Sequence, residues 1–536
     1  MATTTATAGV APGPAEPDDL ARFGYRQELH RSVGSFASFA AGFSFVSILT
    51  TVFQLFALGF GLGGAAFFWT WPLVFAGQYL VALNFSTLAA RFPISGAIFQ
   101  WSSRLGGQTV GWFTGWLMII GQILTVATAA IALQAVLPSI WSGFQIVGGP
   151  DADPTPTSPS GAANSVVLGV CLLVVTTVIN AVGVRLMALV NSTGVVLEIV
   201  GVVVIIAALL FHAQRGPAIL FTTAGVDLSS GGSYLSAWLA SGLMAAYVMV
   251  GFDSAGELSE ETRDPRRTTP RTILRALWVS GIGGALLIVG ALLAAPRLDD
   301  GNLATGGLPW VLNEVLGPVA GRILLVDVAI AVVSCTLAVQ TSGSRMVFSM
   351  ARQKALPFHR MLSRVSPRTG TPIVASVVVG VGAALALAVN LRQAAIFTAL
   401  ASLCIAMLYL AYLGVTVPLL LARLRQARLG RTDPEELDEA GEPVFSLGRW
   451  GIPLNVAAIG YQVFAVVNLA WPRGSVYDLT GHTWWLQWSA VLVIAACLAV
   501  GFFVHRRLHP HVTRIPLAPI HAHGHLEMPE RVADHA

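Results

Sequence analysis

Long apolar segments and short polar connections alternate along the whole chain. Each apolar segment runs for about 18 residues or more, the length that an α-helix needs to cross the hydrocarbon core of a bilayer. We therefore predict twelve transmembrane helices. Their predicted ranges are 36–58, 66–88, 108–136, 164–182, 188–211, 235–256, 272–295, 320–345, 372–389, 395–420, 453–470 and 486–504.

The apolar segments are continuous, which indicates helices and not β-strands. A transmembrane barrel would show segments of about ten residues in which apolar and polar positions alternate. The composition agrees, because 55% of the 536 residues are hydrophobic and only 11% are charged, compared with about 25% charged residues in ordinary globular proteins. These values exclude a soluble enzyme, a disordered chain and a coiled coil. They predict an all-α polytopic membrane protein in a lipid bilayer.

The basic residues indicate how the spans are oriented. If the N-terminus is cytoplasmic, 26 of the 31 Lys and Arg residues lie in cytoplasmic segments. The five on the other side are Arg215, Arg297, Arg322, Arg392 and Arg473. The positive-inside rule then predicts a protein of the cytoplasmic membrane with both termini in the cytoplasm. The net charge of +4 reports this orientation, and no basic cluster with interleaved aromatic residues indicates a nucleic-acid partner.

Four segments outside the spans are distinctive. Residues 1–34 lack the features of a signal peptide, and we predict a cytoplasmic tail. The Pro-rich loop 148–163 has no basic residue and suits an external connection, whereas the charged loop 423–452 is either a solvated linker or a docking site. The predicted cytoplasmic tail 505–536 is rich in histidine, and its HAHGH sequence at 521–525 could capture metal weakly, with no link to transport.

No pattern in the sequence indicates a cofactor or a metal centre. The GFGLGG sequence at 59–64 resembles a dinucleotide-binding fingerprint, but it ends a predicted membrane helix and follows no strand, so we reject that function. The cysteines all lie in apolar segments without paired spacing, and we interpret them as small buried hydrophobic residues. They are Cys171, Cys335, Cys404 and Cys497.

The hydropathy pattern repeats within the chain. Spans 2 to 5 correspond to spans 7 to 10 with offsets of about 206 to 210 residues. Because an odd number of spans separates each pair, the two units have opposite orientations, which is typical of inverted repeats. We predict a first repeat at 35–211 and a second at 235–422, with two further spans at 453–504.

The first span of each repeat is interrupted by polar or helix-breaking residues. Span 1 carries Ser44, Ser47, Thr50 and Thr51 among apolar neighbours, and span 6 carries Gly251, Phe252 and Asp253. Unwound backbone at these positions would free N–H and C=O groups to bind a carboxylate and an ammonium group, and the ends of the half-helices would add favourable dipoles.

Five stretches connect the chain to a known superfamily. They are RSVGSFASFAAGFSFVSILT entering span 1, ARFPISGAIFQWSSRLG after span 2, NAVGVRLMALVN between spans 4 and 5, GFDSAGELSEETRDPRRTTPR at span 6, and SGSRMVFSMARQKALP ending span 8. With them the chain resembles the amino acid permeases of the amino acid/polyamine/organocation superfamily over about 20–420, most closely the amino acid/choline transporter group. The resemblance implies the LeuT-type five-plus-five fold, a central site for an amino acid or amine, and secondary transport.

The resemblance also implies that the substrate binds at the two interruptions. Tyr247 aligns with an aromatic gate over the substrate and Phe252 could line the pocket, although either could simply pack. We interpret Asp253 as a charge near the substrate amine or a gate contact, in preference to a buried structural acid. The predicted substrate-binding residues are Ser47, Ile48, Leu49, Thr50, Thr51, Tyr247, Val250, Gly251, Phe252 and Asp253.

The coupling ion depends on one departure from the relatives. Several bacterial relatives carry a lysine in span 5 where this chain aligns Glu198, which is expected to face the interruption of span 1 and to lie near Ser334 and Thr336 of span 8. A desolvated carboxylate could gain and lose a proton as access alternates. Sodium binding by ionised Glu198 and a structural capping role are the alternatives. A second departure, Gln353 and Lys354 where relatives often have Asp-Gly, affects only a cytoplasmic loop.

Other charged residues are expected at the span ends. We predict an ion pair between Asp327 and Arg322 at the external rim. Three acids followed by three arginines at the cytoplasmic mouth predict either a charge-paired inner gate or a solvated loop. They are Glu257, Glu260, Glu261, Arg263, Arg266 and Arg267.

Two other classes of function compete with a carrier. An integral membrane enzyme needs convergent acid, base or metal ligands, but His30, His212, His359 and His482 lie at span ends, so we predict that the chain is not an enzyme. A transporter-like sensor or channel is the other alternative. The sequence does not identify the substrate among amino acids, GABA, choline and polyamines.

Overall fold

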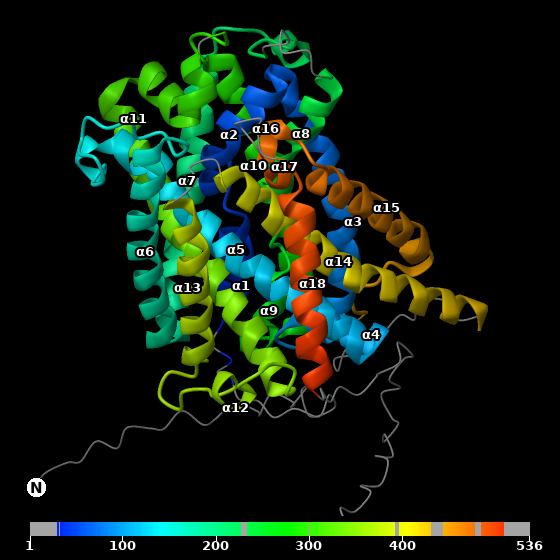
Figure 1. Ribbon diagram of the computed structural model, residues 1–536. Helices are drawn as coiled ribbons and strands as arrows, with labels where there is room; N and C mark the ends of the chain where they lie inside the picture. The colour runs from blue at the N-terminus through cyan, green and yellow to red at the C-terminus, as the bar shows by residue number, and fades with distance from the viewer. Residues whose placement is uncertain are drawn as a thin grey trace, which may run out of the picture.

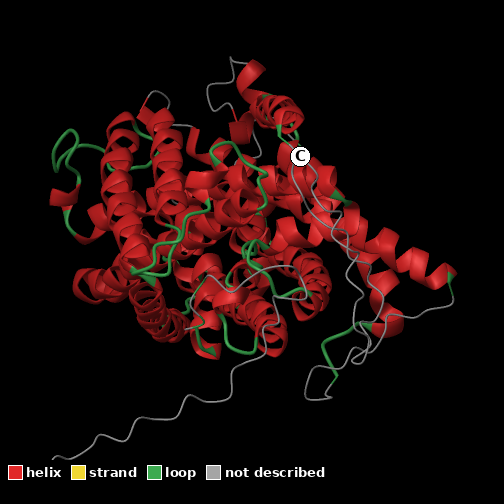
Figure 2. Cartoon of the chain, turned by 90° about the horizontal axis from the view of Figure 1, so that it is seen from below, coloured by secondary structure: helices red, strands yellow, loops and turns green. Residues whose placement is uncertain are grey.

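The computed structural model describes residues 29, 31, 33–226, 233–299, 301–391, 396–429, 443–477 and 484–508. Most of the predicted N-terminal tail, the HAHGH segment, Arg392 and the acidic part of the 423–452 loop lie outside these residues. The described chain consists of helices and connecting loops, as Figure 2 shows. An isolated parallel bridge joins Val33 and Thr262.

Figure 1 shows the order of the helices along the chain. The helices are α1 (Ser35–Val46), α2 (Ile48–Gly63), α3 (Thr70–Arg91), α4 (Ala97–Gly106), α5 (Gln108–Ile140), α6 (Pro159–Val182), α7 (Val184–Phe211), α8 (Tyr234–Val248), α9 (Ser254–Glu257), α10 (Pro265–Ala294), α11 (Gly301–Arg352), α12 (His359–Leu362), α13 (Ile373–Ala388), α14 (Ile396–Arg428), α15 (Gly451–Ala470), α16 (Gly474–Tyr477), α17 (Trp484–Gln487) and α18 (Ser489–Arg507).

The prediction of an all-α polytopic membrane protein is confirmed. In the described chain, eleven helical segments are long and apolar enough to cross a membrane, and α8 is a shorter apolar helix. Together they coincide with the twelve predicted spans, with α1 and α2 forming the first of them. Within predicted span 6, regular helix stops at Val248, where α8 ends, and α9 is only four residues long.

The greatest departure from the predicted spans is in α11, which begins 19 residues before predicted span 8. It contains non-helical backbone at Gly307 (φ 54°, ψ −144°) and Gly317 (φ 76°, ψ 166°), so the segment consists of several helices joined by kinks. The glycines and prolines of 301–318 have the composition of a loop. The first kink lies against α2, since a Cβ at Gly307 would lie 3.3 Å from Cβ of Ala57.

Helix α5 lies in the middle of the bundle, where it packs against α11, α14, α4 and α6. Small residues allow the close approach that membrane helices need, because lipid supplies no hydrophobic driving force between them. A Cβ at Gly414 of α14, for example, would lie 2.1 Å from Oγ1 of Thr114 in α5. By contrast, α18 presents exposed apolar side chains such as Phe502 and Phe503. It therefore lies at the periphery.

The prediction that all four cysteines are buried is wrong for Cys171, which is exposed, and Cys497 is only partly buried. Cys335 and Cys404 are buried, and all four are free thiols. A continuous apolar segment gives no indication of which face turns toward lipid, so the position of Cys171 could not be read from the sequence.

Candidate functional site

The break in span 1 is a single residue, Ser47, between α1 and α2. Its backbone adopts φ 34° and ψ 97°, a region that non-glycine residues rarely occupy. The Ser47 Oγ accepts a hydrogen bond from the backbone N–H of Thr50 at 3.3 Å. Ser47 therefore ends one helix and forms the N-cap of the next.

The break in span 6 covers the five residues from Met249 to Asp253. Gly251 has φ +87°, and a Cβ there would lie 1.7 Å from Cδ1 of Phe45, two residues before the break in span 1. A glycine is required by both the backbone conformation and the space. The prediction that both spans are interrupted is confirmed, and the break in span 6 packs against Phe45 near the end of α1.

Two side chains from other helices support the break in span 6. The Tyr412 hydroxyl of α14 donates to Oδ1 of Asp253 and accepts from the N–H of Gly251 at 3.1 Å. The Gln78 amide of α3 donates to the carbonyl oxygen of Met249 at 2.9 Å. Sequence reasoning missed both residues. The available signal was a polar group in the middle of an apolar span, which has to find a hydrogen-bond partner.

The predicted substrate-binding residues all lie in these two breaks or within one turn of them, and all are buried. Phe252 packs against the rings of Phe85 and Tyr412, with centroids 5.9 and 5.7 Å away. The Thr51 hydroxyl donates to the carbonyl oxygen of Ser47 at 2.6 Å. Asp253 keeps one oxygen, Oδ2, buried and without a hydrogen-bond partner among the described residues. This oxygen is an acceptor available to a ligand.

Glu198 of α7 reaches the break in span 1, as expected from the sequence. Its Oε1 accepts from the Ser47 hydroxyl at 2.9 Å and from the backbone N–H of Leu49 at 3.1 Å. The side chain therefore caps the start of α2. Its other oxygen, Oε2, is buried without a partner, and the residue is 0% exposed.

The two predicted partners of Glu198 in α11 differ in position. Ser334 faces α7, because a Cβ at Gly194, one turn before Glu198, would lie 1.9 Å from its Oγ. The Thr336 hydroxyl instead donates to the carbonyl oxygen of Val332 in its own helix at 2.8 Å. Ser334 is thus the nearer candidate for a shared site with Glu198.

The predicted ion pair between Asp327 and Arg322 does not form among the described residues. Residues five apart on a helix do not share a face, unlike residues three or four apart. Arg322 is exposed. The Asp327 carboxylate turns toward α7, where a Cβ at Gly201 would lie 1.6 Å from its Oδ2.

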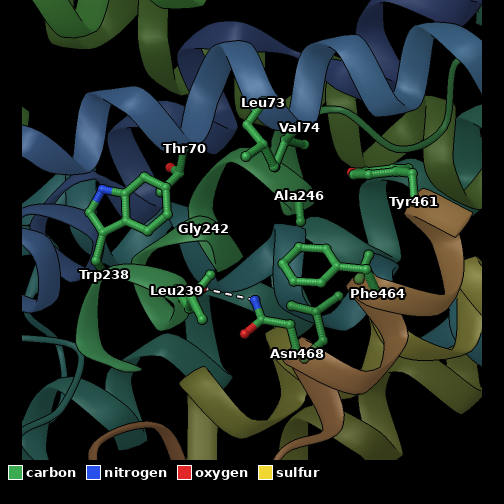
Figure 3. Close-up of a pocket in the computed structure, with 12 residues that line it drawn as sticks. Thr70, Leu73, Val74, Trp238, Leu239, Gly242, Ala246, Tyr461, Phe464 and Asn468 are labelled. Atoms are coloured by element: carbon green, nitrogen blue, oxygen red, sulfur yellow. Dashed lines mark hydrogen bonds between the residues drawn. The ribbon is translucent and has the colours of Figure 1, made fainter. Parts of the chain in front are cut away.

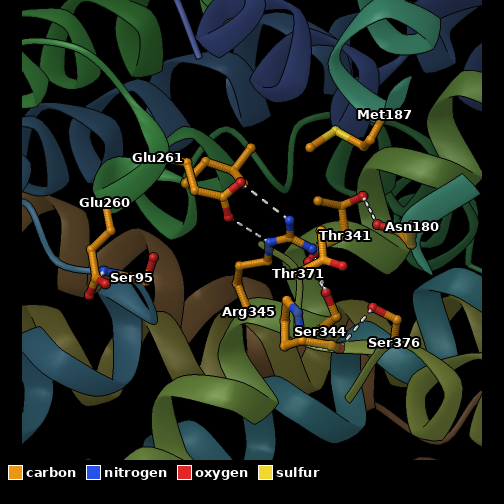
Figure 4. Close-up of polar contacts among 12 residues, drawn as sticks. Ser95, Asn180, Met187, Glu260, Glu261, Thr341, Ser344, Arg345, Thr371 and Ser376 are labelled. Carbon is orange, nitrogen blue, oxygen red and sulfur yellow. Dashed lines mark hydrogen bonds and ion pairs between the residues drawn. The ribbon is translucent and has the colours of Figure 1, made fainter. Parts of the chain in front are cut away.

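Buried ion pairs join the segment after α9 to α11 at the predicted cytoplasmic end. Glu261 pairs with Arg345 at 2.8 Å (Figure 4), and Glu260 pairs with Arg352 at 2.6 Å. Glu260 also accepts from the backbone N–H of Ser95 at 3.1 Å. The three acids predicted at this mouth are at most 1% exposed, so the solvated-loop alternative is wrong for them. The charge-paired alternative holds for Glu260 and Glu261, with the partners on α11.

Val33, two residues before α1, is hydrogen-bonded to the same segment. The backbone N–H of Val33 donates to the carbonyl oxygen of Glu261 at 2.9 Å, and the N–H of Arg263 donates to the carbonyl oxygen of Val33 at 3.0 Å. This is the short parallel bridge noted above. It joins the chain before α1 to the chain after α9, on the predicted cytoplasmic side of both breaks.

A cavity of about 280 Å³ lies toward the other end of the bundle. Its lining includes Gln54 of α2, Gln134 of α5, Thr305 of α11, Thr398 of α14 and the loop 154–157. Beside this loop, hydrogen bonds from Thr155 lower the pKa of Asp153 below its usual value, so its carboxylate is ionised at neutral pH. The cavity therefore combines a mainly apolar lining with several polar side chains, and the Asp153 carboxylate precedes its lining residue Pro154.

A second pocket, between α3, α8 and α15, measures only about 30 Å³ (Figure 3). Its lining is largely apolar, and the Asn468 amide donates to the carbonyl oxygen of Leu239 at 2.9 Å. That volume is enough for one or two water molecules. It is too small for an amino acid.

Among the described residues, no group of three or more His, Cys, Asp or Glu side chains could hold a metal ion. The polar features of the bundle are instead two helix breaks, partnerless carboxylate oxygens and a closed, charged end. This is the arrangement expected where a small polar molecule is bound inside a membrane.

Comparison with known proteins identifies the family. A sequence profile of the family described as "Amino acid permease" matches residues 32–509. The chain belongs to this family. It is similar to the amino-acid permease BAT1 of Arabidopsis thaliana, with 26% identity over 518 residues, covering 91% of this chain and 94% of that protein.

Another relative has a different named substrate. The chain is 26% identical over 506 residues to the thiamine transporter thi9 of Schizosaccharomyces pombe, covering 86% of this chain and 81% of that protein. Membership of the amino acid permease family, together with the many apolar helices, establishes a multi-pass membrane protein of a transporter family.

Proposed function

We propose that this permease is a secondary active transporter that moves an amino acid or related amine across the cytoplasmic membrane by alternating access. The observation that carries the proposal is that Gly251, in the break of span 6, packs against Phe45, two residues before the break of span 1 at Ser47. Broken helices inside a bundle offer backbone groups that no intrahelical bond satisfies, and these groups are the usual ligands of small substrates in membranes.

The amine group of the proposed substrate is better supported than its carboxylate. Asp253 supplies a partnerless buried oxygen in the span 6 break, which suits a protonated amine. The start of α2 offers less to a substrate carboxylate, since Glu198 already accepts from the N–H of Leu49 and Ser47 already accepts from the N–H of Thr50. We therefore place the amine group of the substrate beside Asp253.

The two ends of the bundle support an outward-open arrangement. The cavity of about 280 Å³ lies at the predicted external end, and the ion pairs Glu261–Arg345 and Glu260–Arg352 close the predicted cytoplasmic end. A carrier that alternates must break such pairs when it opens inward. With both termini in the cytoplasm, the positive-inside rule assigns the ends in this way.

Proton coupling through Glu198 is the favoured mechanism, with sodium as the alternative. A buried carboxylate is costly to keep ionised, and Glu198 uses the same carboxylate to hold the break in span 1. Protonation would weaken the hydrogen bonds to Ser47 and Leu49 and thereby loosen the break. The sodium alternative uses ionised Glu198 with Ser334 as ligands.

Transport by purified protein in proteoliposomes tests the proposal. Candidate amino acids, GABA, choline and polyamines are first screened by thermal shift, since a ligand that binds only the folded state raises stability. A binder is then assayed under an imposed pH gradient without sodium, and under a sodium gradient without a pH gradient. Accumulation in the first assay alone supports proton coupling. Trans-stimulated counterflow identifies a carrier, and its absence would favour a channel or sensor.

A further inference from the structure

A second carboxylate shares the region of Glu198. Asp327 of α11 points at the face of α7 that carries Gly201, three residues from Glu198. A Cβ at Gly201 would meet Oδ2 of Asp327 at 1.6 Å and Cδ1 of Leu49 at 3.5 Å. Leu49 is the residue whose backbone N–H binds Glu198. Both carboxylates therefore converge on the first turn of α2, on either side of Leu49.

Each carboxylate has an oxygen without a protein partner. Oδ2 of Asp327 and Oε2 of Glu198 are both buried atoms that make no hydrogen bond within the described chain. The two groups are neighbours, because Gly201, which the Asp327 carboxylate meets, lies about one helical turn from Glu198 on α7. Two neighbouring carboxylates in a poorly solvated site cannot both ionise at low cost, and one proton shared between them relieves the repulsion.

No cation of the described chain faces this pair to replace the proton. Helices α1, α2, α5 and α13, which pack around α7 and α11, carry no ionisable side chain. Cys335 of α11 is a buried thiol that donates to the carbonyl oxygen of Phe45 at 3.6 Å and carries no positive charge. On α7 itself, Arg185 lies 13 residues from Glu198, about 20 Å along the helix. Cys171 of α6 is exposed.

The remaining charged groups on the packed elements belong to the opposite end of the bundle. Glu257 of α9, Arg104 of α4, the arginines at the start of α10, and His359 and Arg360 of α12 lie toward the end where α11 carries Arg345 and Arg352. Arg345 lies about 27 Å along the helix from Asp327, at 1.5 Å per residue. Arg322 is exposed on another face of α11.

We propose that Asp327 and Glu198 form one proton-binding pair. Asp327 exchanges the proton with the surroundings, and protonation of Glu198 weakens its hydrogen bonds to Ser47 and Leu49 in span 1. This rests on the proposed proton coupling. Asp327 retains partial exposure, whereas Glu198 is 0% exposed. The step is a transfer of one proton from the carboxyl O–H of Asp327 to the carboxylate of Glu198, and no other bond changes. Asp327 is thus a coupling residue beyond the site assigned from the sequence.

The test compares Asp327→Asn with Glu314→Gln, a matched change at an exposed acid of the same helix. Substrate accumulation on a pH gradient and proton uptake per substrate, read with a trapped pH dye, are measured beside counterflow. We expect Asp327→Asn to keep counterflow but to lose accumulation and proton uptake, Asp327→Glu to restore both, and Glu314→Gln to behave as the wild type. Normal proton uptake by Asp327→Asn would overturn the pair while leaving proton coupling intact. If the wild type itself takes up no protons, the proposed coupling fails and the pair fails with it.

A chemical measurement on the wild type keeps the test independent of variant folding. Dicyclohexylcarbodiimide reacts with protonated carboxyl groups in apolar surroundings, and mass spectrometry identifies the modified peptide. A shared proton predicts that each molecule is modified at Glu198 or at Asp327 but not at both, with loss of accumulation. Independent modification of both residues, or of neither, would contradict the shared proton.

Discussion

The breaks in spans 1 and 6, which lie near each other in the bundle, are built in different ways. Span 1 is broken at one residue, whose hydroxyl caps the next helix and binds the carboxylate of Glu198. Span 6 is broken over five residues around Gly251 and is supported by Tyr412 and Gln78. The first break depends on an ionisable group, whereas the second depends on space and on neighbouring side chains. Coupling is therefore expected at span 1 and substrate recognition at span 6.

The largest expected effect is steric, at span 6. Gly251→Leu should abolish uptake, because even a Cβ would overlap Phe45 and the positive φ disfavours any side chain. Gly460→Leu is the matched control, since nothing lies within 4 Å of a Cβ there. Uptake is measured in proteoliposomes at equal reconstituted protein. Unimpaired uptake by Gly251→Leu would move the substrate site elsewhere.

The next effect separates coupling from binding at span 1. Glu198→Gln should lose accumulation on a pH gradient and keep exchange of internal for external substrate, because the amide still fills the space but cannot take up the proton. The readout is the ratio of internal to external substrate at steady state. A variant that still concentrates substrate would make Glu198 a structural cap of α2.

A smaller effect is expected when Tyr412, which supports the break in span 6, is changed. Tyr412→Phe removes the hydrogen bonds to Asp253 and Gly251, and losing one such bond costs about 1.5 kcal/mol, or roughly tenfold in apparent affinity. The half-saturating substrate concentration should rise while coupling to the pH gradient persists. Tyr461→Phe, which removes a hydroxyl bonded to Tyr409 at 2.8 Å, is the control outside the break. Equal effects from both variants would indicate general loosening of α14.

The smallest effect is expected from the cap itself. Ser47→Ala removes an N-cap, worth about 1 kcal/mol, or roughly fivefold in an equilibrium. We expect a modest loss of thermal stability and a shift in the pH dependence of uptake, since Glu198 loses one donor. Ser44→Ala changes a buried hydroxyl that has no hydrogen-bond partner and should have no such pH effect. An unchanged pH profile for Ser47→Ala would separate the cap from coupling.

The spans and the positions of both breaks could be predicted from sequence because they depend on local composition. Eighteen apolar residues specify a membrane helix wherever they occur, and Gly251 beside a buried acid marks a place where helix is costly. The helical segments before Gly317 could not be predicted, because the glycines and prolines of this stretch have the composition of a loop.

The partners of charged side chains that come from distant helices could not be predicted from the sequence. The sequence paired Glu260 and Glu261 with nearby arginines, but Arg352 and Arg345 lie more than 80 residues away and bind them through the packing of α11. Asp327 was assigned to Arg322 by proximity along the chain, although the face of the helix decides the contact. Ion pairs depend on three-dimensional position, which a one-dimensional pattern of charges does not contain.

The bridge between Val33 and Thr262 gives the two broken spans a common mechanical anchor. Val33 precedes α1 by two residues, and Thr262 follows α9 after a single 3₁₀ turn. A tilt of either span would therefore pull on the other through backbone hydrogen bonds, with no need for substrate to transmit the force. The cytoplasmic halves of spans 1 and 6 are therefore expected to move together, and the ion pair between Glu261 and Arg345 holds them against α11.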